Sequence, residues 1–473
     1  KPMDRFVSEL ISMGGSQFNG GPAGFGQASQ NDVPEAAKAN VIARAFLGID
    51  LTCARCHDSP SNSIRQQDVF ELAAMLRKKP IQLPVTSSVA NSENFSDIKV
   101  TLEPGQMIQP NWPFNRDMNS KSRQGKDGAE RLMGDTRRKL SELITDSENR
   151  RFSMVMVNRI WSRLMGKGLA DSSDEFVIQD SDNIPLIEYL ADYFTSNGYD
   201  AKKLIRLIMK SNAYQRQSSE DDELVEDWGA RKIRNLTAEQ IVDSLFSISG
   251  KPMSIGELTF DPEGRRTAST FLNLGNPSRS WELIGLANER DRPALSLPRA
   301  QSVVNVLSAF GWRESRPNPI TEREETATLI QPLVLANGDA AHRATQLSAD
   351  SFFTRLAIQS RSVEKLTQDS YLQVLGRLPS SAELAIVTAE LENGFEGRLI
   401  AGPTQTGDYA SQFRTAVSWS NHLHPEATRI KIEIERAVRQ GDTPTARLQP
   451  RWRERMEDVV WALFNTPEFR TVQ

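Results

Sequence analysis

The residues best suited to chemistry lie together near the amino end of the chain, in the pentapeptide Cys53-Ala54-Arg55-Cys56-His57. Cys53 and Cys56 are the only cysteines among 473 residues, and the chain has only four histidines. Three chemistries fit two thiols that are separated by two residues and followed by an imidazole. They are covalent attachment of haem, a dithiol–disulfide redox pair and metal binding.

Haem attachment agrees best with this pattern. The two thiols add to the two vinyl groups of the porphyrin, and the adjacent imidazole becomes the proximal ligand of the iron. A redox pair needs only Cys-x-x-Cys, but no thioredoxin-like strand–helix–strand pattern surrounds the motif. A structural zinc site needs two further ligands, and the nearest other histidine, His342, is far away in the sequence. We therefore expect one haem c on Cys53 and Cys56 with His57 as axial ligand, and a disulfide or redox pair is the alternative.

The elements around the motif follow from hydrophobic periodicity. Apolar residues at helical spacing run from residue 35 to residue 49 and lead directly to Cys53, and a second helix is expected over 67–78, before Pro80. Residues 80–130 are rich in Pro, Gly, Asn and Ser, which indicates a small β-containing insert or a wrapping segment. A short strand is expected where apolar and polar residues alternate at Ile98, Val100 and Leu102.

The remainder of the chain predicts helices. Thr237 and Ser380 each begin a capping box, and residues 250–320, with many Gly, Pro, Asn and Arg, are expected to be irregular. The sequence thus predicts a mainly α, multi-block protein, with a haem domain over 1–130 and a helical domain over 131–473. The later helices are expected over 322–336, 347–360, 366–376, 381–394, 411–421 and 450–465.

Composition excludes several classes of function. Lys and Arg number 57 against 61 Asp and Glu, a net charge of −4, which argues against a nucleic-acid partner. No run reaches the roughly 18 consecutive apolar residues of a membrane helix. Signature motifs of common hydrolases, nucleotide-binding proteins and metalloproteases do not occur. The chain starts without Met or a signal segment, and we expect it to be part of a longer precursor.

The run Ala45-Phe46-Leu47-Gly48-Ile49-Asp50-Leu51-Thr52-Cys53-Ala54-Arg55-Cys56-His57 resembles the planctomycete-specific cytochrome C domain family, as does Asp4-Arg5-Phe6-Val7. The rest is similar to the domain of unknown function that usually follows it. The matching pieces include Asn158-Arg159-Ile160-Trp161, Gly166-Lys167-Gly168-Leu169, Leu236-Thr237-Ala238-Glu239-Gln240, Gln331-Pro332-Leu333-Val334-Leu335, Leu375-Gly376-Arg377 and Leu463-Phe464-Asn465-Thr466-Pro467-Glu468-Phe469.

This resemblance implies an exported, periplasmic or cell-envelope protein. It favours a monohaem c-type cytochrome module for electron transfer, fused to a helical domain that docks a partner or substrate. One alternative is a haem-dependent oxidoreductase on an organic substrate, for which a polysaccharide-derived compound is one option. The other is a structural or assembly component of the cell envelope in which Cys53 and Cys56 form a disulfide or hold a haem without turnover. A redox donor or acceptor protein is the implied partner, and the resemblance adds a co-encoded sulfatase/phosphatase-like protein as a candidate.

One difference from the sequence pattern of the family concerns the sixth ligand of the iron. The family continues the motif as His-x-His-Pro, whereas this chain has His57-Asp58-Ser59-Pro60. Met75 or Met107 is therefore expected to complete the coordination. Further candidates are Met118, Met133, His342, His422 and His424, and an open sixth position is the other expectation.

Two arginine features are expected to be structural. Arg159 is predicted to form an ion pair with a carboxylate such as Asp174 or Glu175. The arginines between residues 313 and 323 are predicted to form a salt-bridge network with the neighbouring glutamates, or to bind haem propionates.

Overall fold

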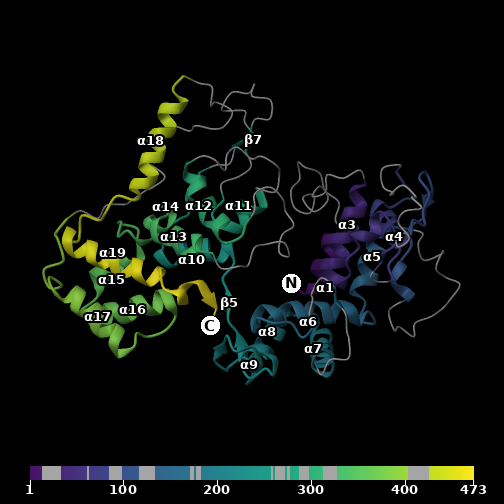
Figure 1. Cartoon of the computed structure of the whole chain (residues 1–473), viewed down its shortest axis with the longest axis horizontal. Coiled ribbons are helices and arrows are strands. Elements are labelled where there is room, and N and C mark those ends of the chain that lie inside the picture. Colours follow the sequence, from purple (N-terminus) through teal and green to yellow (C-terminus); the bar gives the residue numbers. More distant parts are fainter. Residues whose placement is uncertain are drawn as a thin grey trace. The chain divides into compact units, whose positions relative to one another are not determined.

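The protein is mainly α-helical, as the sequence predicts (Figure 1). This computed structural model describes residues 1–12, 33–60, 63–84, 99–116, 134–170, 175–176, 183–256, 259–260, 272–273, 277–286, 298–312, 328–402 and 425–472. The chain divides into two compact units, Lys1–Ile233 and Arg234–Gln473. Each unit has its own hydrophobic core. None of the helices within these ranges combines the length and apolar character needed to cross a membrane.

The first unit is a set of helices with two short strand pairs. Its elements are α1 (Met3–Ser12), α3 (Pro34–Ile42), η1 (Ala43–Leu47), η2 (Cys53–Arg55), α4 (Gln66–Arg77), β1 (Ile81–Gln82), β2 (Met107–Ile108), η4 (Pro113–Arg116), α5 (Thr136–Thr145), α6 (Arg150–Met165), α7 (Ile184–Ser196), α8 (Ala201–Met209), β3 (Ser218–Ser219), α9 (Asp222–Glu226) and β4 (Arg231–Lys232). The helices expected over 35–49 and 67–78 are confirmed. The first of them ends in the π-helical turn η1, and such turns are frequent at functional sites.

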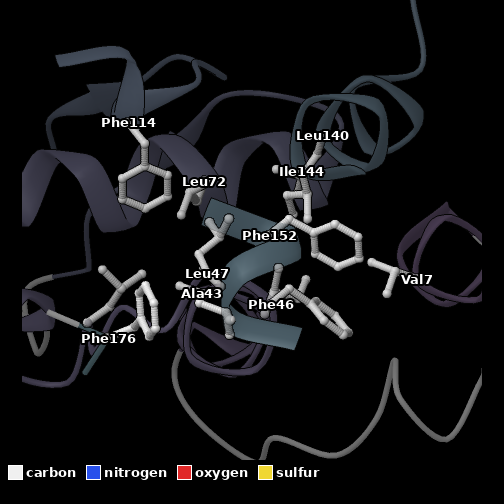
Figure 2. Close-up of a cluster of buried hydrophobic side chains, with 14 of the residues drawn as sticks. Val7, Ala43, Phe46, Leu47, Leu72, Phe114, Leu140, Ile144, Phe152 and Phe176 are labelled. Atoms are coloured by element: carbon white, nitrogen blue, oxygen red, sulfur yellow. The ribbon is translucent and has the colours of Figure 1, made fainter. Parts of the chain in front are cut away.

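The core of the first unit draws on segments from before and after residue 130. Figure 2 shows side chains of α1, η1, α4 and η4 packed with those of α5 and α6. The labelled members are Val7, Ala43, Phe46, Leu47, Leu72, Phe114, Leu140, Ile144, Phe152 and Phe176. The boundary expected at residues 130 and 131 lies outside the described residues. That boundary stays a prediction. The two compact units meet between Ile233 and Arg234, and within the first of them α5 packs on α1 and α4, and α6 packs on η1.

The β-containing insert is confirmed, but its strands are not where the sequence predicts. β1 and β2 pair antiparallel, with Gln82 opposite Met107. Ile98 lies outside the described residues, and 99–102 form no strand. The backbone of that segment binds the motif loop and α4 instead. The carbonyl oxygen of Lys99 accepts from the Asp58 amide at 2.8 Å, and the Leu102 amide donates to the Gln66 side chain at 3.3 Å.

The second unit is also helical. Its elements are β5 (Arg234–Asn235), α10 (Ala238–Ser249), β6 (Thr259–Phe260), β7 (Leu272–Asn273), α11 (Ser280–Leu286), α12 (Pro298–Ala309), α13 (Ile330–Asn337), α14 (Asp339–Thr345), α15 (Phe352–Gln359), α16 (Val363–Leu375), α17 (Ser381–Glu392), α18 (Ala427–Gln440), α19 (Pro450–Phe464), η10 (Pro467–Arg470) and β8 (Thr471–Val472). β5 and β8 pair antiparallel and join the two ends of the unit. Both predicted capping boxes form, at the starts of α10 and α17.

Sequence periodicity misses some helices of this unit. Residues 250–320, expected to be irregular, contain α11 and α12. α12 is rich in valine, whose branched side chain lowers helix propensity, but Val303, Val304 and Leu307 are buried, and tertiary packing outweighs that preference. α14 and α18 were not predicted either. The helix expected over 411–421 lies outside the described residues, as does the start of the one expected over 322–336.

Candidate functional site

The two thiols lie on one turn of 3-10 helix. In η2 the amides of Cys56 and His57 donate to the Cys53 carbonyl oxygen at 3.2 and 3.4 Å. Ala54 is completely buried and holds the turn against the core, whereas Cys53 is exposed and Cys56 is half-buried. Both cysteines are free thiols. The turn therefore presents two thiols, with two residues between them, at the surface of the first unit.

The imidazole of His57 has a defined orientation. Its Nδ1 lies 2.8 Å from the carbonyl oxygen of Asp58. A carbonyl oxygen only accepts hydrogen bonds, so Nδ1 carries a proton and donates. In the neutral ring the lone pair is then on Nε2. A metal-bound histidine commonly donates its second ring N–H to such a carbonyl, so this arrangement suits an Nε2 ligand.

The segment before the turn is held by side chains of α3 and of the loop itself. Asn40 accepts from the Leu51 amide at 2.8 Å, and its amide nitrogen donates to Thr52 Oγ1 at 3.0 Å. Asp50 accepts from the Thr52 amide at 2.8 Å. These contacts fix the chain up to Cys53 without using either thiol.

The end of η1 is capped by two arginines of α6. Arg151 donates to the carbonyl oxygens of Leu47 at 2.6 Å, Gly48 at 3.2 Å and Phe176 at 2.6 Å. Arg159 donates to those of Arg44 at 2.8 Å and Ala45 at 3.2 Å. Two of these carbonyl oxygens also accept backbone amides, that of Arg44 from Gly48 at 3.2 Å and that of Gly48 from Phe176 at 2.8 Å. The two guanidinium groups add further donors at this turn and join α6 to the segment that leads to Cys53.

Gly48 is required at this junction. It has φ of +58°, and a Cβ added there would lie 2.5 Å from the Cβ of Phe176. The ion pair predicted between Arg159 and Asp174 or Glu175 stays a prediction, and Asp174 lies outside the described residues. Sequence reasoning missed the role of Arg151, and its position at the start of a helix offered no distinguishing signal.

The predicted sixth ligands occupy different surroundings. Met75 is completely buried in α4, about 14 Å along the helix axis from Gln66 at its start. Met107 is 54% exposed on β2. His342 belongs to α14 of the second unit, where its Nε2 lies 3.0 Å from Gln346 Nε2. Met118, Met133, His422, His424 and the arginines between residues 313 and 323 lie outside the described residues. No group of three or more His, Cys, Asp or Glu side chains in the described part of the chain is arranged to hold a metal ion.

The second unit contains a buried charge cluster that the sequence does not reveal. Asp442 binds Lys251 Nζ at 2.8 Å and Arg343 Nε at 3.1 Å, and all three side chains are almost fully buried. Burial lowers the pKa of the Lys251 amine, and it raises the pKa of the nearby Glu457 carboxyl. The three partners come from distant parts of the sequence, so no local pattern marks them. They join the end of α10, α14 and the end of α18.

Fold and loop together define a mainly α protein that carries a Cys-x-x-Cys-His turn on its amino-terminal unit. The chain belongs to the family described as "PSD1: Protein of unknown function (DUF1553)", whose model matches residues 136–391. The model described as "PSCyt2: Protein of unknown function (DUF1549)" matches residues 13–80, which include the turn. These are the planctomycete cytochrome C domain and its associated C-terminal domain, so the predicted resemblance is confirmed. No curated protein and no solved structure matches the chain.

The two family matches do not coincide with the two compact units. The PSD1 match begins at the start of α5 and continues into α17, so it covers parts of both units. The first unit combines the PSCyt2 match with the first helices of the PSD1 match. Arg151 and Arg159 are among the polar links between the two matches, and Thr136 and Arg137 at the start of α5 add hydrogen bonds to the carbonyl oxygens of Met75 and Leu76.

Proposed function

We propose that this chain is an exported monohaem c-type cytochrome used for electron transfer. Cys53 and Cys56 would form thioether bonds to one haem c, and His57 Nε2 would bind the iron. The observation that carries this proposal is the bond between His57 Nδ1 and the Asp58 carbonyl, which leaves Nε2 as the ligand atom beside two free thiols. When bound, the haem supplies a one-electron carrier.

The chain's own residues hold and orient the group. The turn of η2 sets the spacing of the two sulfur atoms, and buried Ala54 fixes the turn against the core. Arg151 and Arg159 attach the preceding segment to α6, so the thiols lie on a rigid support. Met75 or Met107 as sixth ligand would raise the potential relative to a second histidine.

The proposed setting is the periplasm or cell envelope, because haem is attached to Cys-x-x-Cys-His outside the cytoplasm. A single haem exchanges electrons with another carrier, so a redox donor or acceptor protein is the proposed partner. The family resemblance makes a co-encoded sulfatase/phosphatase-like protein a candidate. The second unit, which has its own core, is the proposed docking part.

A dithiol function is the second candidate, and the exposure of Cys53 beside Cys56 favours it. An exposed thiol close to another is accessible to oxidants and can form a disulfide. In that case the chain would be a redox or structural component of the envelope without haem. The two candidates use the same two sulfur atoms and exclude each other in one molecule.

One expression experiment tests the proposal. The full chain is exported in cells that attach haem c, and the purified protein is examined by pyridine haemochrome spectroscopy and acid-acetone extraction. We expect one acid-stable haem per chain, retained by the control His342→Ala and lost in Cys53→Ala/Cys56→Ala. A high-spin spectrum would indicate an open sixth position and favour an oxidoreductase over a carrier. Protein without a Soret band, whose mass shows the loss of two thiol hydrogens, would overturn the haem proposal in favour of the disulfide.

A further inference from the structure

Asp58, the residue that follows the motif, is bound on several sides. Its amide donates to the carbonyl oxygen of Lys99 at 2.8 Å. Its Oδ1 accepts from the Gln66 amide at 2.9 Å and from Thr101 Oγ1 at 2.7 Å. Gln66 is the first residue of α4, so the carboxylate satisfies one of the amides that a helix start leaves without a partner. Residue 58 is therefore attached both to the start of α4 and to the segment that contains Lys99 and Thr101.

Gln66 completes the attachment from inside the core. Its side chain is completely buried, and both ends of the amide are used. Nε2 donates to the carbonyl oxygen of Arg55 at 3.4 Å, and Oε1 accepts from the Leu102 amide at 3.3 Å. Arg55 lies between the two cysteines, so one buried amide connects the thiol turn to the segment that holds Asp58. Leaving such a buried amide without partners costs stability.

We propose that Asp58 and Gln66 are positioning residues for His57. Together they fix the backbone of residue 58. The carbonyl oxygen of that residue accepts the proton of His57 Nδ1, which leaves Nε2 as the ligand atom. The ligand role of Nε2 rests on the proposed function, whereas the choice of tautomer does not depend on haem.

The tautomer is a useful observable because a free neutral histidine side chain prefers the proton on Nε2. A chain that holds it on Nδ1 therefore reports the bond to the Asp58 carbonyl directly. Loss of one ordinary hydrogen bond changes an equilibrium by about fivefold. We expect a change of about this size in the tautomer ratio when the support of residue 58 is removed.

The test uses the full chain produced without haem attachment and labelled with 15N in its histidines. Long-range proton–nitrogen NMR at a pH where the imidazole is neutral gives the tautomer ratio, and the spectrum of His57→Gln assigns the signal. We expect the Nδ1–H form in the unsubstituted chain and a shift of about fivefold toward Nε2–H in Asp58→Leu and Gln66→Leu. Asp58→Asn keeps an acceptor oxygen and should retain the original ratio.

Asp50→Leu is the matched control, because it removes a loop carboxylate that binds the Thr52 amide and not residue 58. An Nε2–H form in the unsubstituted chain would overturn the proposal, as would an equal shift in Asp50→Leu and Asp58→Leu. If Asp58→Leu does not fold, Thr101→Val removes a single bond to Asp58 and should give a smaller shift in the same direction; an unchanged ratio there also overturns it. Failure to attach haem would leave these results intact, so the two proposals fail separately.

Discussion

Replacing Arg151 by methionine should loosen the segment that carries the thiols. The guanidinium donates to the carbonyl oxygens of Leu47, Gly48 and Phe176, and it lies 5.7 Å from the centre of the Phe176 ring. Methionine can follow the same path with its apolar stem but donates no hydrogen bond. The Leu47 carbonyl would then lose its guanidinium donor, whereas the Gly48 carbonyl would keep the Phe176 amide.

The expected size of the effect follows from those contacts. A hydrogen bond to a charged group contributes about 1.5–3 kcal/mol. Arg151 makes three, but the bonds share one half-buried group and are not additive, so we expect a loss of about 3 kcal/mol from the first unit. Since 1.4 kcal/mol is a factor of ten, local opening around η1 should become roughly 100-fold more frequent.

Hydrogen exchange measured by mass spectrometry on peptides that cover residues 43–57 gives this opening directly. Arg163→Met is the matched control, because Arg163 lies on the same helix with an exposed side chain. Arg151→Lys keeps the charge but not the planar set of donors, so the exchange of residues 43–57 in this variant should be intermediate between Arg151→Met and Arg163→Met. Equal protection of residues 43–57 in Arg151→Met and Arg163→Met would refute the argument that α6 supports the site.

Three further substitutions test the second unit. Thr237→Ala removes the cap of α10 and should lower the unfolding free energy by about 1 kcal/mol in a urea titration. Lys251→Met leaves buried Asp442 with one cation fewer, and should cost about 3 kcal/mol in the same titration. Arg377 lowers the pKa of Glu383 from its ordinary 4.5 to about 2. The ionised Glu383 therefore stabilises the fold above about pH 4.5 and loses this effect as the pH falls toward 2. The melting temperature of Glu383→Gln should consequently depend less on pH over that interval than that of the unsubstituted chain.

Each of these three substitutions has a control variant. Thr237→Ser keeps the capping hydroxyl, and an equal loss in Thr237→Ser and Thr237→Ala would contradict the capping argument. Adding Asp442→Leu to Lys251→Met should recover part of the stability, and no recovery would show that the charge pair is not the cause. Glu390→Gln alters an exposed carboxylate on the same helix as Glu383, and should leave the acid dependence unchanged.

Local signals in the sequence determine much of the helical architecture. Apolar spacing predicts the helix before the motif and α4, and Thr237 and Ser380 form the capping boxes that their spacing indicates. These features depend on residues within about one or two helical turns, so a short stretch of sequence contains the necessary information. The Cys-x-x-Cys-His motif is local in the same sense, and so are the pieces that carry the family resemblance.

Other features depend on which segments meet in space. The alternation at Ile98, Val100 and Leu102 predicts a strand, but the backbone of residues 99 and 102 binds Asp58 and Gln66 instead. Polar backbone groups take the partners that packing places beside them, and a sequence pattern does not specify those partners. The core of the unit that holds the motif also depends on such contacts, because α5 and α6 complete it from outside the segment around the motif.

The sequence by itself determined that two thiols and an imidazole are adjacent on a mainly helical chain, since that requires only neighbouring residues and periodicity. Tertiary structure decided how they are presented. The proton on His57 Nδ1 follows from the carbonyl of Asp58, whose amide and carboxylate are bound by Lys99, Gln66 and Thr101, which lie 8 or more residues along the chain from Asp58. The buried pair of Lys251 and Asp442 likewise exists only because folding removes both charges from water together.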